Sequence, residues 1–466
     1  MGAFNFYCFR CLYGDSYGWI GINMTSNPTS VRRAAAQLRS PRWALQGGSL
    51  GLGLLAAAAL TPASATDGYF SNGYGIKAKG RAGVALTATD DAFGGANNPA
   101  TVSEESDRID IGLEWFRPER RAERTGPAAP FNGAVTSDRN DFFIPEIGYR
   151  RGLSRDFALG VAVYGNGGMN TDYPAGQLNL GPGASDLNLL AGPGHLGVNL
   201  SQLFLTPTLA WKFAPNQSIG LSPVLAYQRF KAYGLGAFSA LSQAPSALTD
   251  QGPDESWGSG ARIGYLWNVS QSVSVGLTYA SRVYTTGFDQ YRGLFAGDGS
   301  FDVPQTVGAG VGWQATPELR LSADYKWIDY AQIRPVGNAL NRPGLLGQSG
   351  GPGFGWESIH VAKAAADWKV NDIWTLRTGY GYSGNPVGPE DVSFNIVAPG
   401  VVQHHVAAGF TWTQGHHEIS GAYQHSFENS VTGDSFFTAL GLAPAGTRET
   451  ISMSQDSFAL QYSYRF

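Results

Sequence analysis

The sequence predicts an all-β fold: a transmembrane antiparallel β-barrel of about 14 strands, with an N-terminal segment plugging its lumen. Three observations lead to this expectation. From about residue 108 onward the chain repeatedly alternates apolar and polar residues with period two, aromatic residues gather where these segments end, and short connections alternate with long ones. The mean hydropathy of -0.16 agrees, because it averages an apolar outer face with a polar lumen.

The first part of the chain predicts a signal peptide, residues 1–65. Its apolar run, residues 50–60, has 11 residues, too few to cross about 30 Å of hydrocarbon as a helix. Ala63-Ser64-Ala65 fits the cleavage site, so the mature chain is expected to start at Thr66. The residues before about Val31 do not fit a signal peptide, and we interpret them as an upstream start codon assigned in error. The basic region before the apolar run consists of Arg32, Arg33, Arg39 and Arg42.

Both cysteines, Cys8 and Cys11, lie in this removable part, so their C-x-x-C spacing is a weak signal for redox chemistry or metal. Without residues 1–65 the chain keeps 27 basic and 35 acidic residues, a formal charge of -8. A cysteine-free chain excludes a disulfide scaffold. An acidic chain without a basic stripe also gives no support to nucleic-acid binding.

The last predicted strand shows the alternation most clearly. Phe458, Leu460 and Tyr462 share one face, while Ala459 and Gln461 share the other. Similar segments are expected at residues 108–121, 140–151, 156–165, 197–213, 218–233, 256–268, 272–283, 303–314, 318–330, 356–369, 373–383, 402–414, 416–427 and 455–466.

The connections and the tryptophans favour a membrane barrel over a soluble sandwich. Six tight turns, such as residues 315–317, alternate with seven long loops, such as residues 332–355, which places both chain ends on the periplasmic side. Closure is expected because a barrel leaves no unpaired strand edge in hydrocarbon. Terminal Phe466 fits the C-terminal signal read by the barrel assembly machinery. The tryptophans expected in an interfacial girdle are Trp211, Trp267, Trp313, Trp368, Trp374 and Trp412.

Residues 66–107 precede the first strand and do not alternate. They are rich in Gly and Ala and have little apolar bulk, so they need another structure to pack against. Because the lumen of a 14-stranded barrel conducts water unless it is filled, we predict that this segment plugs it. The alternative is a disordered leader.

Several motifs of the mature chain resemble the FadL-type outer-membrane transporters. The runs at residues 69–75, 80–85 and 90–92, followed by Asn97-Asn98-Pro99-Ala100, are similar to the N-terminal hatch of that family with its Asn-Pro-Ala motif. The likeness continues through residues 164–170 and 374–380 to the C-terminus. Together the pieces span Thr66 to Phe466.

The resemblance implies a function and a location. It implies passive uptake of hydrophobic small molecules, fatty acids or hydrocarbons, through the cell outer membrane of a Gram-negative bacterium. Ligand would be captured by the loops, would enter the barrel, and would leave sideways past a kinked third strand after the hatch moves. Long-chain fatty acids are the expected substrates. We expect a monomer among outer-membrane lipid and lipopolysaccharide, with no cofactor, no metal and no nucleic acid.

Two groups of residues are candidates for the transport machinery. Gly165, Gly167 and Gly168 close the third predicted strand, and clustered glycine lets a strand bend or stop pairing, although a flexible strand end explains them as well. In the hatch, Pro99 locks φ and extends the residue before it, so Asn98, Pro99 and Ala100 are linked to transport as a fixed turn. A purely structural role for this motif is an equal alternative.

The loops at about residues 171–196 and 234–255 are apolar for exposed connections. They are candidates for ligand capture, and packing of the two loops on each other is the alternative. The candidate capture residues are Leu187, Leu189, Leu190, Leu235 and Phe238.

Other groups of residues give weaker evidence for a binding site. His404-His405 and His416-His417 offer one inward metal ligand each at most, because adjacent strand residues face opposite sides. Four lumen cations, Arg320, Lys326, Arg377 and Arg465, are candidates to meet a carboxylate head group.

No catalytic motif is present, so we predict no enzyme. A general diffusion porin is the first alternative, and an outer-membrane hydrolase using a pair such as His425-Ser426 is the second. A porin is expected to lack the N-terminal plug and to conduct ions steadily.

Overall fold

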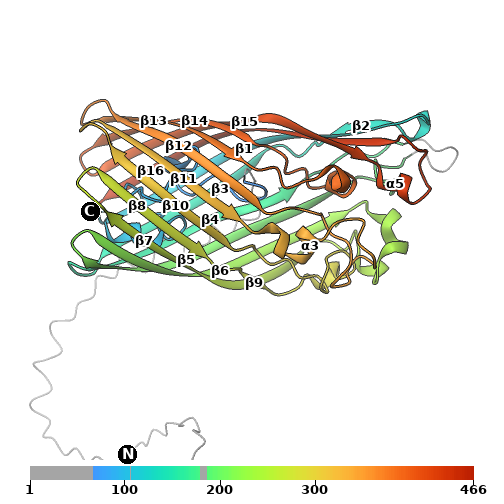
Figure 1. The fold of residues 1–466 in the computed structure, drawn as a ribbon, viewed down its shortest axis with the longest axis horizontal. Coiled ribbons are helices and arrows are strands. Elements are labelled where there is room, and N and C mark those ends of the chain that lie inside the picture. Colours follow the sequence, from blue (N-terminus) through green and yellow to red (C-terminus); the bar gives the residue numbers. More distant parts are fainter. Residues whose placement is uncertain (1–66, 105, 179–185) are drawn as a thin grey trace, which may run out of the picture. The chain divides into compact units, whose positions relative to one another are not determined.

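Within residues 67–104, 106–178 and 186–466, the part of the chain that the computed structural model describes, fourteen strands close into an antiparallel barrel (Figure 1). β1 (Arg108–Thr125) pairs along its whole length with β16 (Arg448–Arg465), so the wall has no free edge. The other wall strands are β3 (Phe142–Gly152), β4 (Phe157–Asn170), β5 (Gly197–Ala214), β6 (Gln217–Tyr233), β7 (Asp254–Asn268), β8 (Val273–Ala280), β10 (Thr306–Gln314), β11 (Leu319–Ile328), β12 (Ile359–Lys369), β13 (Trp374–Ser383), β14 (His404–Gln414) and β15 (His417–Asp434).

Two further strands only extend the wall. β2 (Gly133–Thr136) pairs with the far end of β1, and β9 (Tyr284–Thr285) pairs with β7. The prediction of fourteen wall strands is therefore confirmed. The predicted signal peptide and both cysteines lie in residues 1–66, outside the described part of the chain.

The short helices lie in the segment before β1 and in the long loops. No helix among the described residues is long and apolar enough to cross a membrane. The helices are α2 (Ile76–Lys79) and η1 (Pro99–Ser103) before β1, and then η2 (Ala129–Phe131), η3 (Gly236–Leu241), η4 (Pro245–Ala247), η5 (Asp289–Tyr291), η6 (Tyr330–Gln332), α3 (Arg334–Gly337), η7 (Pro389–Asp391), α4 (Val392–Asn395) and α5 (Phe436–Ala439).

The connections divide the barrel into a short-turn end and a long-loop end. Tight turns join β5 to β6, β7 to β8 and β14 to β15, while long loops join β4 to β5 and β11 to β12. β15 and β16 run several residues past the predicted segments toward the long loops. Their extensions were missed there because the outward residues are polar, because in β16 the apolar Ile451 and Met453 face inward, and because β15 shifts register between Ser426 and Asn429.

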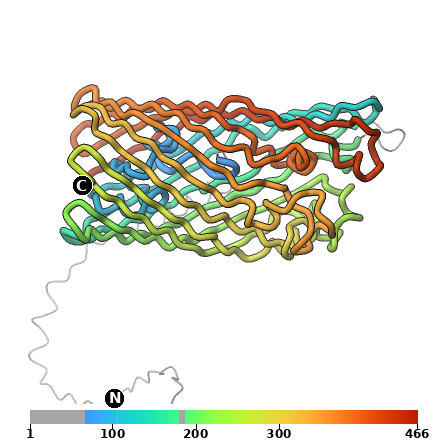
Figure 2. The backbone as a smooth tube through the Cα atoms, viewed as in Figure 1, coloured from blue at the N-terminus to red at the C-terminus, as the bar shows by residue number. Residues whose placement is uncertain are grey.

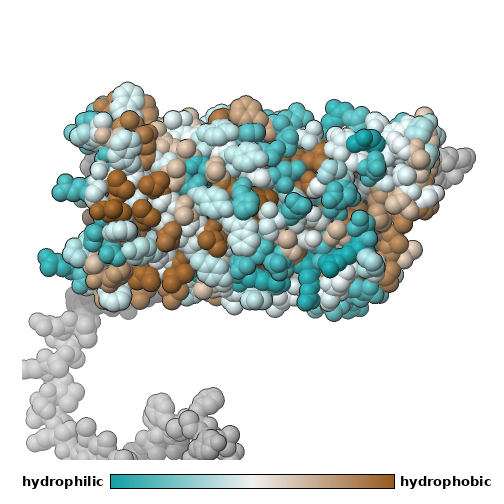
Figure 3. Space-filling model, viewed as in Figure 1, coloured by the Kyte–Doolittle hydropathy of each residue, from teal (hydrophilic) through white to brown (hydrophobic). Residues whose placement is uncertain are grey.

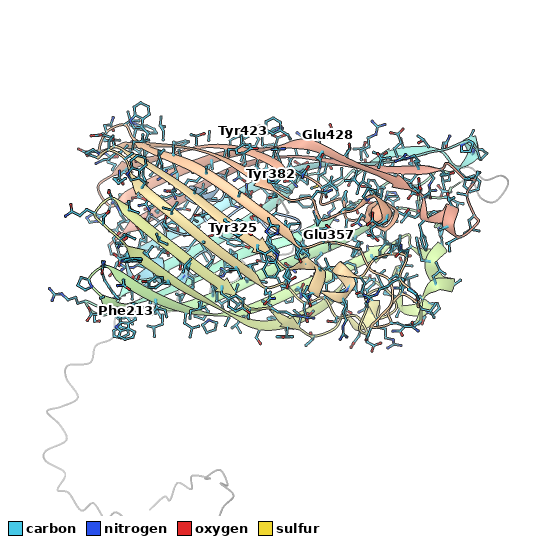
Figure 4. All side chains as sticks on the ribbon, viewed as in Figure 1. Phe213, Tyr325, Glu357, Tyr382, Tyr423 and Glu428 are labelled. Carbon is cyan, nitrogen blue, oxygen red and sulfur yellow. The ribbon has the colours of Figure 1, made fainter. Side chains whose placement is uncertain are left out.

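The outer wall carries the apolar face that the period-two pattern predicts. Apolar side chains gather toward the short-turn end (Figure 3), and polar side chains become common toward the long loops. Figure 4 places Phe213 at the short-turn end, Tyr325, Tyr382 and Tyr423 further along, and Glu428 beyond them. Two aromatic levels with an apolar band between them are typical of a barrel that crosses a membrane.

The segment before β1, residues 67–107, lies inside the barrel, in the half nearer the short turns (Figure 2). We call this segment the hatch, and residue 105 of it lies outside the described residues. Its helix η1 packs on β5, β6 and β7, while α2 packs on β14 and β15. The lumen is therefore filled from two opposite sides of the wall.

Candidate functional site

The first described residues of the hatch pair with the end of β4. The Ser71 N–H donates to the Asn166 carbonyl at 2.9 Å, and the Gly168 N–H donates to the Tyr69 carbonyl at 3.0 Å. Opposite this contact β4 shifts its register against β5 between Gly165 and Gly167. A Cβ at Gly167 would stand 1.8 Å from the Tyr69 oxygen, so only glycine permits this approach.

β3 and β4 separate at the same place. They pair from Gly152↔Ala158 to Ile147↔Val163. Beyond that point the rest of β3 pairs only with β1 among the described strands. Residues 166–170 of β4 are all buried, so the in-and-out alternation of this strand ends there and protein covers both of its faces. The three glycines predicted as a kink thus lie where the barrel wall loses a strand pairing.

A narrow cavity of about 30 Å³ adjoins this separation. The hatch contributes Tyr69 and β4 contributes Met169 to a mainly apolar lining, together with Phe116, Arg120 and Trp356. Tyr69 is fully buried and its ring lies 5.8 Å from the Trp356 ring. The cavity is therefore bounded by the two parts that the resemblance names, the hatch and the third strand.

Asn98, Pro99 and Ala100 lie on the other side of the hatch. The Asn98 side-chain amide donates to the carbonyls of Leu86 at 2.8 Å and Tyr265 at 3.1 Å, and its oxygen accepts from the Ala100 N–H. This turn seats the hatch on β6 and β7. The motif has the geometry of an anchor, and a direct part in transport stays a prediction.

Four charged groups form a closed ring between hatch and wall. Arg81 contacts Asp90 at 2.6 Å and Asp367 at 2.8 Å. Arg377 contacts the same two carboxylates at 3.0 and 2.9 Å. Burial by itself would raise the pKa of Asp90, but the facing Arg81, Lys77 and Arg377 hold that pKa well below its usual range.

Further ion pairs tie the hatch to the wall. Lys77 contacts Glu418 at 2.7 Å and Lys79 contacts Glu114 at 2.8 Å. Asp67, fully buried, contacts Lys363 at 2.8 Å. Burial raises the pKa of Asp67, and the charges of Lys363 and Lys326 outweigh that effect and hold it below its usual range.

A polar cavity of about 470 Å³ lies at the short-turn end, lined by Arg81, Asp90, Asp367 and Arg377 among others. Such charged surroundings offer an apolar molecule no hydrophobic contacts. The hatch therefore presents two different faces: charged groups toward the short turns and an aromatic cavity beside β4.

The four lumen cations considered for a carboxylate ligand already have partners. Arg320 donates to the Thr87 carbonyl of the hatch at 2.7 Å, and Arg377 belongs to the charged ring. Lys326 lies 3.9 Å from Asp67 and Arg465 lies 3.3 Å from Glu418. These side chains hold the hatch and the end of the wall.

The five candidate capture residues pack together. Leu189, Leu190, Leu235 and Phe238 are buried in the main apolar cluster, and Leu187 is partly buried against it. The Phe238 ring lies 5.8 Å from Phe394 and 6.0 Å from Phe437, which come from two other loops. They form the interior of the loop layer, and a role in ligand capture stays a prediction.

The histidines do not assemble a metal or catalytic centre in the described residues. No group of three or more His, Cys, Asp or Glu side chains there could hold a metal ion. His425 contacts Asp456 on the outer wall at 2.9 Å, whereas buried Ser426 contacts His405 at 2.8 Å inside. His425 and Ser426 therefore point to opposite faces and do not form a catalytic pair.

Three residues were not identified from the sequence: Arg120 and Trp356, which line the cavity, and Tyr330, which contacts Tyr69 behind it. The Tyr330 hydroxyl accepts from the Tyr69 N–H at 3.1 Å and donates to the Asp67 carbonyl at 2.5 Å. Their partners lie far away along the chain, so no local spacing reveals them. The one available signal is the alternation of inward and outward positions along β1, which places Arg120 on the inward face.

This architecture is shared with known proteins. Residues 55–466 match the family model described as outer membrane protein transport protein (OMPP1/FadL/TodX). A search of the curated proteins by sequence finds no match.

Three solved structures share the fold. The Pseudomonas putida toluene transporter TodX is 16% identical, with TM-score 0.61, over 85% of this chain and 99% of its own. A Pseudomonas aeruginosa FadL homologue is 15% identical, with TM-score 0.63, over 86% and 100%. The Ralstonia pickettii toluene transporter TbuX is 15% identical, with TM-score 0.58, over 85% and 99%.

Proposed function

This chain belongs to the OMPP1/FadL/TodX family of outer-membrane transport proteins, and we propose that its substrates are long-chain fatty acids that leave the barrel sideways between β3 and β4. Members of this family are transporters of hydrophobic compounds in the outer membrane of Gram-negative bacteria and are not enzymes. The family membership supplies the general activity. The route and the substrate are our proposals.

One observation carries the proposed route: the hatch pairs with β4 where β4 parts from β3. If residues 69–71 withdraw from Asn166 and Gly168, the inner side of the separation opens to the aromatic cavity. In this proposal ligand collected by the long loops enters the cavity, and a small movement of the first hatch residues releases it into the membrane.

Sideways release suits an apolar solute on energetic grounds. Each CH₂ group costs about 0.8 kcal/mol when it is returned to water, so direct passage from the apolar cavity into the bilayer spares a long alkyl chain that cost. The alternative exit leads past the charged ring of Arg81, Asp90, Asp367 and Arg377. An alkyl chain finds no apolar contact along that path.

A general diffusion porin is the competing function, and the packing of the hatch argues against it. Ion pairs hold the hatch on β1, β12, β13 and β15 through Glu114, Asp367, Arg377 and Glu418. A porin requires a permanently open lumen. We expect purified protein in planar bilayers to show no steady conductance, and a steady high conductance would refute the transporter proposal.

Deleting Asn166 tests the route. The deletion removes the extra residue between Gly165 and Gly167, so that β4 continues in register with β5. Asn166→Ala is the matched control, because it removes the side-chain bonds to Tyr74 and Gln202 but keeps the register shift. We expect uptake of radiolabelled hexadecanoate by cells to fall more than about tenfold for the deletion, and to stay near the native rate for Asn166→Ala.

Two outcomes contradict the proposal, and they separate its parts. Native uptake by the deletion variant, with normal folded protein in the membrane, would overturn the sideways route. Uptake of toluene or hexadecane by the native protein with no uptake of hexadecanoate would keep the route and overturn the fatty-acid substrate.

A further inference from the structure

Arg120 is an arginine of the inner wall whose charge has no carboxylate partner among the described residues. Its side chain is 3% exposed, and it lines the cavity beside Tyr69 and Met169. One terminal nitrogen donates to Ser137, Asn140 and the Arg139 carbonyl, all of which are neutral acceptors. The Nε–H faces no acceptor within the described part of the chain.

The other two buried arginines on the inner face of β1 each contact a carboxylate. Arg124, two inward positions further along β1, is equally buried and contacts Glu449 at 2.5 Å. Arg108, nearer the short turns, contacts Asp110 and Glu418. An arginine stays charged at all physiological pH values, and burial without an anion is costly. Arg120 is thus a buried cation that still lacks its anion.

The rest of the cavity suits an alkyl chain. Phe116, Phe142 and Trp356 supply aromatic walls, and the guanidinium of Arg120 lies over the Phe142 ring at 5.7 Å. Two of the four methionines of the chain, Met169 and Met453, also line it. Methionine side chains adapt to ligands of varied shape, which suits a cavity that widens when residues 69–71 withdraw, as in the proposed route.

We propose that Arg120 binds the carboxylate of the transported ligand in this cavity and makes the protein prefer an alkyl carboxylate over a neutral hydrocarbon or alcohol. The proposal rests on the proposed function, because it takes the cavity beside β4 as part of the transport route. One terminal nitrogen is taken up by Ser137, Asn140 and the Arg139 carbonyl, which leaves the Nε–H and the other terminal nitrogen to donate to a carboxylate. The contacts with Ser137 and Asn140 orient the guanidinium.

Binding of two ligands with the same chain tests this assignment. Purified full-length protein in detergent is dialysed to equilibrium against radiolabelled hexadecanoate or radiolabelled hexadecan-1-ol, with protein-free micelles subtracted. The variants are Arg120→Gln, Arg120→Lys and, as matched control, Arg121→Gln, whose side chain is 57% exposed on the outer wall. Mobility of unboiled and boiled samples on denaturing gels establishes that each barrel is folded.

The expected result is selective. Native protein and Arg121→Gln bind hexadecanoate at least about tenfold more tightly than the alcohol, because a charged hydrogen-bonded pair forms only with the acid. Arg120→Gln loses about 10- to 100-fold in affinity for hexadecanoate and keeps its affinity for the alcohol. Arg120→Lys recovers part of the preference, since it restores the charge but not the planar set of guanidinium donors.

Three outcomes would overturn the assignment, and they differ from one another. Unchanged hexadecanoate binding by Arg120→Gln removes Arg120 from the site. An equal loss for acid and alcohol shows a structural role in shaping the cavity. If native protein binds the alcohol but not the acid, or neither ligand, the fatty-acid part of the proposed function fails together with the assignment.

Discussion

The two sides of the hatch differ in how they meet the barrel. Toward the short turns, ion pairs such as Lys77–Glu418 and the ring around Arg81 and Arg377 hold it. Toward the long loops, residues 69 and 70 lie among aromatic rings, including those of Phe301 and Tyr330. Directional charge pairs have one good geometry, whereas apolar contacts tolerate rearrangement. We therefore expect the charged side to hold the hatch in place and the aromatic side, apart from the Asp67–Lys363 ion pair, to rearrange more readily.

The largest expected effect comes from a close approach between the hatch and β7. A Cβ at Gly264 would stand 1.9 Å from the Asn98 side-chain oxygen. We expect Gly264→Ala to abolish folded barrel in the membrane, measured as heat-modifiable protein on gels. Gly152→Ala, whose new Cβ would meet its nearest neighbour at 3.5 Å, is the control and should fold normally. Normal yields for Gly264→Ala would mean that the hatch is not held tightly against β7.

Breaking the charged ring is expected to have the next largest effect. Arg81→Met leaves Asp367 and Asp90 with one arginine between them, and the Arg81 side chain is only 6% exposed. Removing one partner of a buried pair costs about 3–5 kcal/mol. We expect that loss in urea unfolding in detergent, together with new ion conductance.

The control for the ring is an exposed ion pair. Lys369→Met removes the contact with Asp372, whose side chain is 94% exposed, and should leave the free energy of unfolding nearly unchanged. Equal losses in the free energy of unfolding for Arg81→Met and Lys369→Met would contradict the expectation that buried ion pairs hold the hatch on its short-turn side.

A smaller effect is expected on the aromatic side of the hatch, where single hydrogen bonds connect it to the rest of the protein. Tyr330→Phe leaves the Tyr69 N–H and the Asp67 carbonyl without the hydroxyl that serves both. The expected loss is about 1–3 kcal/mol in the free energy of unfolding. Hydrogen exchange at the Tyr69 amide should speed up as well. Tyr284→Phe, at an exposed position, should change neither quantity.

The smallest expected effect depends on pH and involves Asp91 of the hatch. Burial, helped by the nearby charges of Asp90 and Asp110, raises the pKa of Asp91 from 3.8 to about 7. Between these values the folded protein holds a proton that the unfolded chain has released, so the free energy of unfolding falls as the pH rises from about 4 to 7. Above pH 7 the penalty is complete.

Asp91→Asn is therefore expected to be more stable than the native protein above pH 7, because the amide carries no charge there. The difference should shrink below pH 7 and vanish below about pH 4. Asp372→Asn serves as the control, because its exposed pair with Lys369 should change stability little at any pH. A constant advantage of Asp91→Asn at every pH would contradict the pKa shift.

Sequence reasoning succeeded where the physics is local. Alternation of apolar and polar residues identified the wall strands, because lipid and lumen demand opposite chemistry of neighbouring positions. It was less successful where side chains find partners across the barrel. The leucines at 189 and 190 lie in an apolar loop, and nothing in that loop shows that other loops cover them.

What the sequence by itself determined is the membrane barrel: strand number, the order of short and long connections, and the apolar outer face all follow from residues adjacent in the chain. Tertiary structure alone decided how the lumen is used. Arg81 and Asp367 are 286 residues apart, and Asp67 and Lys363 are 296 apart. Contacts over such separations depend on closure of the barrel. That closure also brings Arg120, Met453 and Trp356 together around one cavity.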